Sequence, residues 1–194
     1  MSLSQPLSLL KQAHQLLKPH LHDGAISIDA TVGNGHDTLF LAQHTAPSGM
    51  VYGFDIQPAA INTTRARLQQ AGLLNNVQLT LNSHADMGKH IPQHLRGKIA
   101  AIMFNLGYLP GADKQVITQS DSTLAALNTA LSLLAPKGLL TILAYPGHAG
   151  GDTETLAVQN WSERLAQTCY RCTMHFSNQP TTTAPRLLVV EKLN

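Results

Sequence analysis

Hydrophobic residues near the start of the chain repeat at helical intervals. Their spacing of three, four, three and four residues predicts an N-terminal helix, with Pro6 in its first turn and Pro19 at its end. The stripe consists of Leu7, Leu10, His14, Leu17 and Leu21. We expect His14 to be a packed, hydrogen-bonded histidine rather than a ligand. Residues 1–21 are expected to form a helical extension of the domain.

Beyond this helix, the pattern alternates between short continuous apolar runs and longer amphipathic segments. The run at 99–104 (IAAIMF) is apolar throughout, as a central strand of a parallel sheet should be. The expected strands are 25–30, 50–55, 77–81, 99–104, 139–144, 170–176 and 186–191. The expected helices are 37–46, 58–71, 122–134 and 153–167, the last with Leu156, Trp161 and Leu165 on its inner face.

Strands that alternate with helices form βαβ units, which build a parallel sheet covered on both faces. The last two strand segments follow each other without a helix between them, so one of the two is expected to run antiparallel. The sequence therefore predicts an α/β fold: a doubly wound, mostly parallel seven-stranded sheet with one antiparallel strand near its C-terminal edge. A length of 194 residues fits a single domain over residues 1–194.

Composition and charge exclude several classes of protein. Thirteen Lys and Arg against eleven Asp and Glu give a net charge of +2, so the chain is no polycationic nucleic-acid binder, although an RNA partner is not excluded. No apolar run approaches the roughly 18 residues of a membrane span, and the N-terminal segment lacks the pattern of a secretory signal. We expect a cytoplasmic protein with no metal site. Cys169 and Cys172 form a lone C-x-x-C pair, with ordinary reduced thiols as the expectation and redox or metal chemistry as the alternative.

The densest chemical pattern is DATVGNGHDT at 29–38, where the first expected strand ends. Ligands in doubly wound sheets lie beyond the carboxyl ends of strands, and Gly33 and Gly35 allow the backbone to approach a ligand closely. In a purely structural interpretation the glycines form a plain tight turn, and Asp37 or Thr38 caps the following helix. Because Thr38 occupies the third glycine position, the dinucleotide fingerprint G-x-G-x-x-G is incomplete.

An acidic residue ends the second expected strand. Asp55, in the segment GFDIQP, is placed for bidentate hydrogen bonding to ribose hydroxyls, with a turn cap before Pro58 as the alternative. Ser83 and His84 follow the third strand, where an adenine ring would lie if Asp55 holds the ribose. The glycine turn and the acid thus occur in the order that a nucleoside site requires.

Two further loops follow the fourth and fifth strands and reach the same edge of the sheet. Asn105 and neighbouring carbonyls offer acceptors for an amine, and Tyr108 offers a ring for base stacking. The alternative here is a turn rich in Gly and Pro with incidental polar residues. In the second loop, YPGHAGG at 145–151, His148 is either a substrate contact or an ordinary loop histidine.

These motifs together resemble the YtqB-like family of rRNA methylases, which includes tRNA wobble-uridine methyltransferases. The resemblance runs over about residues 29–191 and rests on IDATVGNGHDT, FDIQ, FNLGYLPGADK, the Ser122–Thr123 pair and YPGHAGG. It implies a class I, Rossmann-like fold that binds S-adenosyl-L-methionine. The implied reaction methylates the 5-aminomethyl group of 5-aminomethyl-2-thiouridine at the tRNA wobble position. Ala112 departs from the family, whose members carry a second glycine there.

The resemblance also implies roles for individual residues. The segment 105–108 (NLGY) is similar to the N-P-P-Y motif of amino-group methyltransferases, with both prolines replaced. The residues expected to bind the cofactor are Asp29, Gly33, Asn34, Gly35, His36, Asp37, Thr38, Asp55, Ile56, Gln57, Ser83, His84, Asn105 and Leu106. The residues expected to orient the acceptor amine or take its proton are Asn105, Tyr108, Asp113 and His148.

The expected partner is tRNA, held through its anticodon stem-loop, and the family suggests a homodimer. A basic patch is predicted to contact phosphates, with scattered solubilising charges as the alternative. The patch consists of Lys114, Arg164, Arg171 and Arg186. Three other functions stay open: methyl transfer to rRNA or a small amine, a nicotinamide-dependent oxidoreductase, and a non-catalytic cofactor- or RNA-binding module. The incomplete glycine fingerprint argues against the oxidoreductase.

Overall fold

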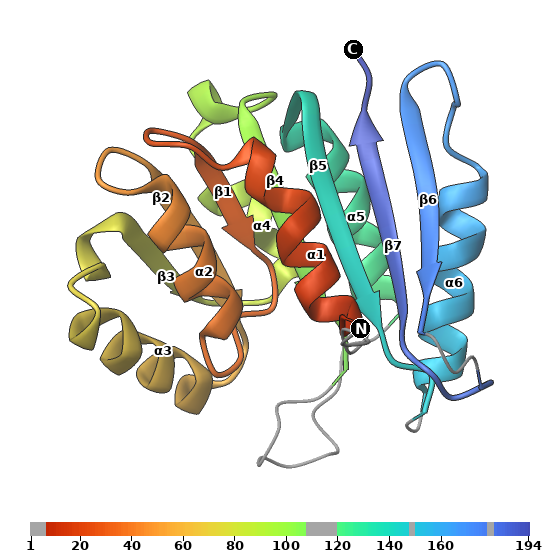
Figure 1. The fold of residues 1–194 in the computed structure, drawn as a ribbon, viewed down its shortest axis with the longest axis horizontal. Coiled ribbons are helices and arrows are strands. Elements are labelled where there is room, and N and C mark those ends of the chain that lie inside the picture. The colour runs from red at the N-terminus through yellow and green to blue at the C-terminus, as the bar shows by residue number, and fades with distance from the viewer. Residues whose placement is uncertain (1–6, 108–119, 148–149, 178–180) are drawn as a thin grey trace, which may run out of the picture.

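The computed structural model describes residues 7–107, 120–147, 150–177 and 181–194. These residues form one seven-stranded sheet in the order β3-β2-β1-β4-β5-β7-β6 (Figure 1). The strands are β1 (Ile26–Asp29), β2 (Met50–Asp55), β3 (Val77–Leu81), β4 (Ile99–Asn105), β5 (Leu134–Ala144), β6 (Tyr170–Phe176) and β7 (Arg186–Lys192). The helices are α1 (Leu9–Leu17), α2 (His36–Thr45), α3 (Pro58–Gln70), α4 (Met87–His90), α5 (Ser120–Leu133) and α6 (Gly151–Glu163), with short 3-10 turns between some of them.

The strand directions confirm the predicted fold class. β1 to β5 pair in parallel, whereas β7 runs antiparallel to both of its neighbours, β5 and β6. The chain passes from β6 to β7 without a helix among the described residues, and a connection of that kind joins antiparallel neighbours. The antiparallel strand therefore lies one place inside the C-terminal edge.

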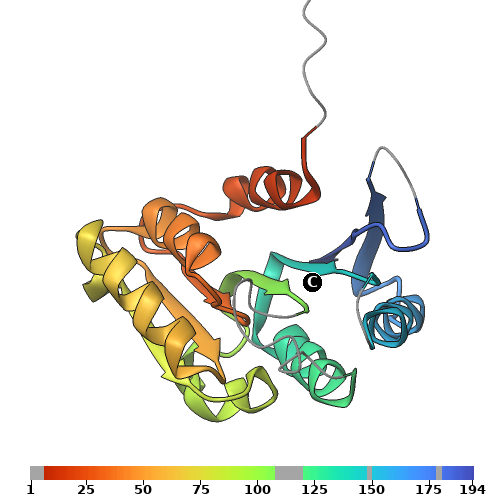
Figure 2. The same ribbon diagram turned by 90° about the horizontal axis from the view of Figure 1, so that it is seen from below.

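Helices cover both faces of the sheet (Figure 2). α1, α2 and α3 pack on one face, where Leu17 and Leu41 belong to one buried cluster. α4, α5 and α6 pack on the other face, where Leu127 and Trp161 belong to a second cluster. Burial of each large apolar side chain contributes about 1.5–3 kcal/mol to folding, so the two clusters fix the helices against the sheet.

The N-terminal segment buries Leu17 and Leu21 as predicted, but the start of its buried stripe differs from the prediction. α1 begins after Ser8, whose hydroxyl accepts a hydrogen bond from the first turn, and Pro19 lies in a 3-10 turn that continues the helix. Leu7 is exposed and Leu10 only half-buried, while Pro6 lies outside the described residues. The buried stripe is Leu9, Ala13 and Leu17. Adjacent leucines at 9 and 10 offer the helix two ways to begin its buried stripe, and packing buries Leu9 rather than Leu10.

Two predicted features in the C-terminal half are wrong. β5 starts at Leu134, directly after α5, and its pairing with β4 shifts where Lys137 adopts a φ of 63°. The Pro-Lys-Gly segment at 136–138 therefore lies inside a strand rather than before it. A β-bulge accommodates the extra residues there without ending the pairing with β4. Leu156 is exposed instead of lying on the inner face of α6, since that face buries Glu154, which accepts a 2.6 Å hydrogen bond from Thr123.

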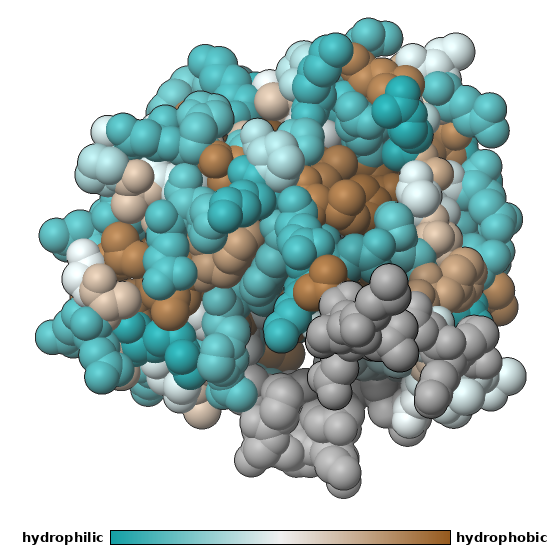
Figure 3. All heavy atoms as spheres, in the orientation of Figure 1, coloured by the Kyte–Doolittle hydropathy of each residue, from teal (hydrophilic) through white to brown (hydrophobic). Residues whose placement is uncertain are grey.

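All parallel strands end at the same edge of the sheet, which places the loops after β1, β2, β3 and β4 beside one another (Figure 1). The face that carries α1 is mostly hydrophilic, with apolar patches between the polar side chains (Figure 3). Within the described ranges, no helix combines the length and apolar character that crossing a membrane requires.

Candidate active site

A cavity of about 580 Å³ opens at the carboxyl edge of the sheet, beside the ends of β1, β2 and β4. Doubly wound sheets bind ligands at this position, beside the first strand. The predicted cofactor residues in its wall are Gly33, Asn34, His36, Asp37, Asp55, Ile56, Gln57, Ser83, His84, Asn105 and Leu106. The other three, Asp29, Gly35 and Thr38, do not line the cavity and lie in the elements that support it.

The glycine turn between β1 and α2 is held from behind by α3. Gly33 and Gly35 have φ values of 52° and 76°, in the left-handed region that favours glycine. The Thr64 hydroxyl donates to the Gly33 carbonyl at 3.1 Å, and Arg67 Nε donates to the Asn34 carbonyl at 2.9 Å. A Cβ atom at Gly35 would lie 2.8 Å from Thr64 Cγ2, so the approach of α3 leaves no room for a side chain there.

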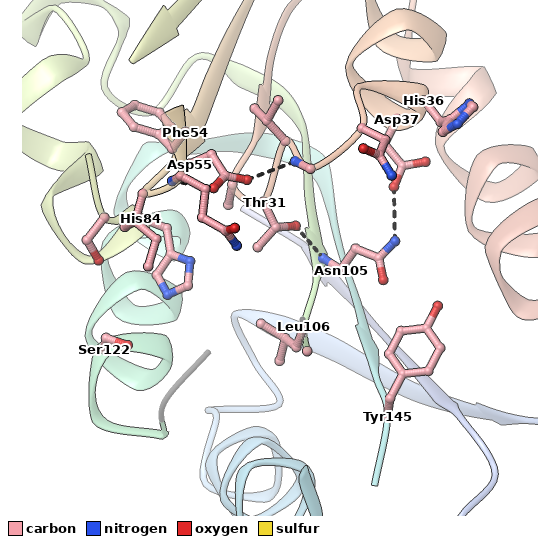
Figure 4. A pocket seen from close by; sticks show the side chains of 18 of the residues that line it. Thr31, His36, Asp37, Phe54, Asp55, His84, Asn105, Leu106, Ser122 and Tyr145 are labelled. Atoms are coloured by element: carbon pink, nitrogen blue, oxygen red, sulfur yellow. Dashed lines mark hydrogen bonds between the residues drawn. The ribbon is translucent and has the colours of Figure 1, made fainter. Parts of the chain in front are cut away.

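Asp55 lies at the cavity wall with both carboxylate oxygens fixed. Oδ2 accepts from the Gly33 N–H at 2.8 Å (Figure 4), and Oδ1 accepts from the Gln57 N–H at 2.9 Å. Each oxygen keeps capacity for a further hydrogen bond, so the turn-forming and ligand-binding interpretations of Asp55 are compatible. Beside it, the apolar side chain of Ile56 is 55% exposed. Two fixed acceptors next to an exposed apolar surface suit a ribose and a stacked base.

His84 places a buried acceptor in the cavity wall. Its Nε2 atom has no hydrogen-bond partner among the described residues. Burial lowers the pKa of His84 and so favours the neutral ring. A hydrogen bond to the Ala30 backbone and the charge of Asp55 act in the opposite direction but are smaller. The hydrogen bond to the Ala30 backbone raises the pKa, as a bond donated by the ring does, and Nε2 is the ring nitrogen without a partner in the described part of the chain. Nε2 is then an acceptor for a donor group on a bound ligand.

Asp29 supports the turn from within the core. Its Oδ2 accepts from the Thr38 hydroxyl at 2.6 Å, and its Oδ1 accepts from the Thr31 N–H at 3.1 Å. Burial and, next, the charge of Asp37 raise the pKa of Asp29 to about 7, against the effect of these hydrogen bonds. Thr38 thus bonds back to the sheet and Gly35 occupies the N-cap position, so neither Thr38 nor Asp37 is the cap of α2.

Asn105 ends β4 at the other end of the cavity. Its N–H donates to Thr31 Oγ1 at 2.7 Å, and its Nδ2 donates to Asp37 Oδ2 at 3.3 Å (Figure 4). This orientation leaves the Asn105 side-chain oxygen to accept from a bound amine. Tyr145 points toward Asn105 and Asp37 (Figure 4). Burial, together with the charge of Asp37, raises the pKa of Tyr145 to about 12.

The N-terminal helix also contributes to this end of the site. His14 Nε2 lies 2.7 Å from Asp37 Oδ1, and the His14 ring stacks on Phe40 with centroids 3.9 Å apart and planes 2° from parallel. The expectation of a packed, hydrogen-bonded histidine is confirmed. Leu10, from the same helix, forms part of the cavity wall.

The predicted basic patch is not assembled by the residues that the structure places. Arg186 begins β7 at the cavity edge of the sheet, whereas Arg171 pairs with Glu191 near the other end of β7, with Nη1 and Oε2 2.7 Å apart. Five positions of β7 separate Arg186 from Glu191, which corresponds to roughly 17 Å. Arg164 follows the end of α6 that lies away from the cavity. The prediction of one patch is therefore wrong for Arg164 and Arg171.

Several predicted residues lie outside the described residues, and several cavity residues were not predicted. The first set consists of Tyr108, Asp113, Lys114 and His148. The second set includes Leu10, Thr31, Phe54, Asn82, Ser122, Tyr145 and Thr183. Asn82 directly follows β3 and Thr31 directly follows the predicted strand at 25–30, a signal that could have identified them. Leu10 carries no such signal, because helix packing alone brings it to the cavity.

Comparisons with known proteins bear on this site. Residues 51–191 match the model of the family described as "Putative rRNA methylase". The chain is 39% identical over 168 residues to the chloroplastic tRNA (mnm(5)s(2)U34)-methyltransferase of Arabidopsis thaliana. That match covers 82% of this chain, and the chain spans 61% of the plant protein's length.

Two crystal structures are similar along nearly the whole chain. The "putative rRNA-methylase" of Clostridium thermocellum is 35% identical with a TM-score of 0.91, and the match covers 97% of this chain and 100% of that one. A "putative methyltransferase" of Streptococcus mutans in complex with SAH is 37% identical with a TM-score of 0.85, at the same coverage. Because the family model matches well over half of the chain, the protein belongs to the rRNA methylase family and has the class I methyltransferase fold that its motifs indicate.

Proposed function

We propose that the protein is an S-adenosylmethionine-dependent N-methyltransferase that acts on 5-aminomethyl-2-thiouridine at position 34 of tRNA. One observation carries the proposal: Asp55, Ile56 and His84 line the same cavity as the hydrogen-bonded pair of Asn105 and Asp37. The first three residues suit a cofactor and the pair suits an amine. The 39% identity to the Arabidopsis enzyme supports tRNA as the acceptor.

The residues of the cavity fit S-adenosylmethionine. The Asp55 oxygens would accept from its ribose hydroxyls, and the unpaired Nε2 of His84 would accept from the amino group of its adenine. The glycine turn at 33–36 would hold its methionine part. The cavity volume of about 580 Å³ lies within the range of cofactor sites. When bound, the cofactor supplies a methyl group that its sulfonium has already activated.

The protein's own contribution is to position and deprotonate the acceptor. An alkylamine is mostly protonated at pH 7, and only the free amine has a lone pair for attack. The side-chain oxygen of Asn105, whose amide is held by Asp37, orients the hydrogens of the amine so that the lone pair faces the methyl group. Such positioning supplies several kcal/mol of the barrier reduction.

The proposed acceptor is tested by mass spectrometry of tRNA nucleosides from a strain that lacks the protein. We expect 5-aminomethyl-2-thiouridine to accumulate and to be methylated when purified protein and S-adenosylmethionine are added. Unchanged nucleosides would redirect the assignment to rRNA or a small amine. Binding of tRNA without methyl incorporation would indicate a non-catalytic module.

The role of Asn105 is tested with the Asn105→Ala variant. We expect it to bind cofactor as the wild type does but to lose roughly 100-fold in kcat, since the amine is no longer oriented. Calorimetry with SAH and a turnover assay separate the two effects. Full turnover with normal binding would refute this role.

A nicotinamide-dependent oxidoreductase is a weaker candidate. The sheet carries an inserted antiparallel β7, which the strand order of dinucleotide-binding domains does not contain, and the third glycine is replaced by the buried Thr38. Calorimetry with NAD and with S-adenosylmethionine distinguishes the two functions.

A further inference from the structure

The N-terminal helix brings a histidine to the end of the cavity where the amine is proposed to bind. His14 Nε2 lies 2.7 Å from Asp37 Oδ1, while Asp37 Oδ2 accepts from Asn105 Nδ2 at 3.3 Å. The two oxygens of one carboxylate therefore connect α1 with the residue that ends β4. Of the three residues His14, Asp37 and Asn105, the last two line the cavity.

The imidazole is held firmly in this position. Its ring stacks flat against Phe40, one turn along α2 from Asp37, with centroids 3.9 Å apart. α1 itself is fixed by the burial of Leu9, Ala13 and Leu17 against the sheet. At the edge of the sheet, Gln12 Nε2 lies 2.9 Å from His175 Nδ1 of β6. We therefore count α1 as an integral part of the domain and of the site.

The His14 side chain is more exposed to solvent than the Asp37 side chain. The Asp37 side chain is 7% exposed, whereas that of His14 is 23% exposed. A proton taken from the cavity by Asp37 thus has a short route through His14 to solvent. Imidazole suits this task, because its ordinary pKa lies nearest to neutral pH among the side chains.

We propose that Asp37 is the proton acceptor for the substrate ammonium and that His14 is the positioning residue that relays the proton to solvent. This proposal rests on the proposed function. The ammonium nitrogen gives one proton to Asp37 Oδ2, and its lone pair forms the bond to the methyl carbon while the electrons of the carbon–sulfur bond stay with sulfur. The product is a secondary ammonium, and the released proton leaves through His14.

Other groups near Asp37 must be included in any interpretation of pH dependence. Among the described residues, Asp29 on β1 and Tyr145 after β5 interact electrostatically with Asp37, and His14 contacts it from α1. His36 follows the glycine turn, 3.3 Å from Arg67 Nη2 of α3. Tyr145 keeps its proton at neutral pH because its pKa is raised to about 12, and Asp29 is enclosed in the core. Asp37 is therefore the carboxylate placed to meet the amine.

The test uses Asp37→Asn and His14→Gln, with His44→Gln as the matched control. His44 also contacts Phe40 but bonds only a carbonyl of its own helix among the described residues. We expect Asp37→Asn to lower kcat at pH 7 about 100-fold and His14→Gln about 10-fold. His44→Gln should match the wild type. In Asp37→Asn, kcat should rise about tenfold per pH unit from pH 7 to 9, because solution alone then supplies the free amine.

Three readouts decide the outcome. Calorimetry should give SAH affinities within about 3-fold of wild type for all variants, and NMR of the imidazole should show an altered His14 signal in Asp37→Asn. A large loss of SAH affinity in Asp37→Asn would overturn the proposal, because the carboxylate would then serve the cofactor. A dependence of kcat on pH in Asp37→Asn that is parallel to that of the wild type would also overturn the proposal. If the wild type itself fails to methylate aminomethyl-thiouridine tRNA, the proposed function fails along with the relay.

Discussion

Replacing Gly35 by alanine tests whether α3 sets the shape of the glycine turn between β1 and α2. Gly35 has a φ of 76°, and its ideal Cβ position lies 2.8 Å from Thr64 Cγ2 and 2.9 Å from Thr64 Cβ. The left-handed conformation costs a residue with a Cβ about 1–2 kcal/mol. Overpacking against the helix adds about 1–3 kcal/mol. We therefore expect Gly35→Ala to lower the free energy of unfolding by about 2–5 kcal/mol.

Gly72 provides the matched control for the backbone contribution. Its φ of 71° is similar, but nothing lies within 4 Å of its Cβ position. Gly72→Ala should therefore cost about 1–2 kcal/mol, the conformational part alone. The difference between the two variants isolates the contact with α3. Urea unfolding at fixed pH measures both.

A double-mutant cycle with Thr64→Ala identifies the contact. This change removes the Thr64 hydroxyl and methyl group and, with them, the hydrogen bond to the Gly33 carbonyl, at a cost of about 1 kcal/mol. In the double variant the crowding is partly relieved, so the combined loss should be smaller than the sum by about 1–2 kcal/mol. Additive losses, or a Gly35→Ala variant no less stable than Gly72→Ala, would refute the argument.

Two further predictions concern the carboxylates. Asp55→Asn should weaken SAH binding about 10- to 100-fold in calorimetry, because charge-assisted hydrogen bonds contribute about 1.5–3 kcal/mol; unchanged affinity would place the ribose elsewhere. The folded-state pKa of Asp29 is raised to about 7 from 3.8, so the folded protein binds more protons between these values and its stability falls as pH rises through them. Asp29→Asn should remove about 2–4 kcal/mol of that fall between pH 4 and 8 in urea unfolding, and parallel curves for the two proteins would contradict the buried acid.

The positions of the central strands were predictable because continuous apolar runs leave few alternatives for a buried parallel strand. β2, β3 and β6 have the predicted bounds, β1 is one residue shorter at each end, and β4 and β7 are each one residue longer at the C-terminal end. The predictions failed at two places in the C-terminal half. Glu154 is a polar residue that is buried, and Lys137 lies in an irregularity that β5 contains without ending. A hydrogen bond to Thr123 satisfies Glu154, and no local pattern indicates such a distant partner.

The short motifs of the site were likewise visible in the sequence. Gly33 lies in the turn after β1 and Asp55 ends the neighbouring β2, and parallel topology brings strand ends together whatever the remaining packing. The sequence separated these residues by 22 positions, whereas the structure joins them through a 2.8 Å hydrogen bond. Motif spacing predicts proximity of this kind, but not which atoms bond.

The amino-acid pattern alone determined the order of strands and helices along the chain, the edge of the sheet at which the cavity opens, and the glycines and acid that we propose to lie around a nucleoside. Tertiary structure alone decided that α1 packs on the sheet with Leu10 in the cavity wall and His14 bonded to Asp37. The physical reason is that strand ends are fixed by local periodicity and chain direction. The docking of a helix depends instead on which of its adjacent leucines, Leu9 or Leu10, fits against the sheet, and that choice is made by packing of residues far apart in the chain.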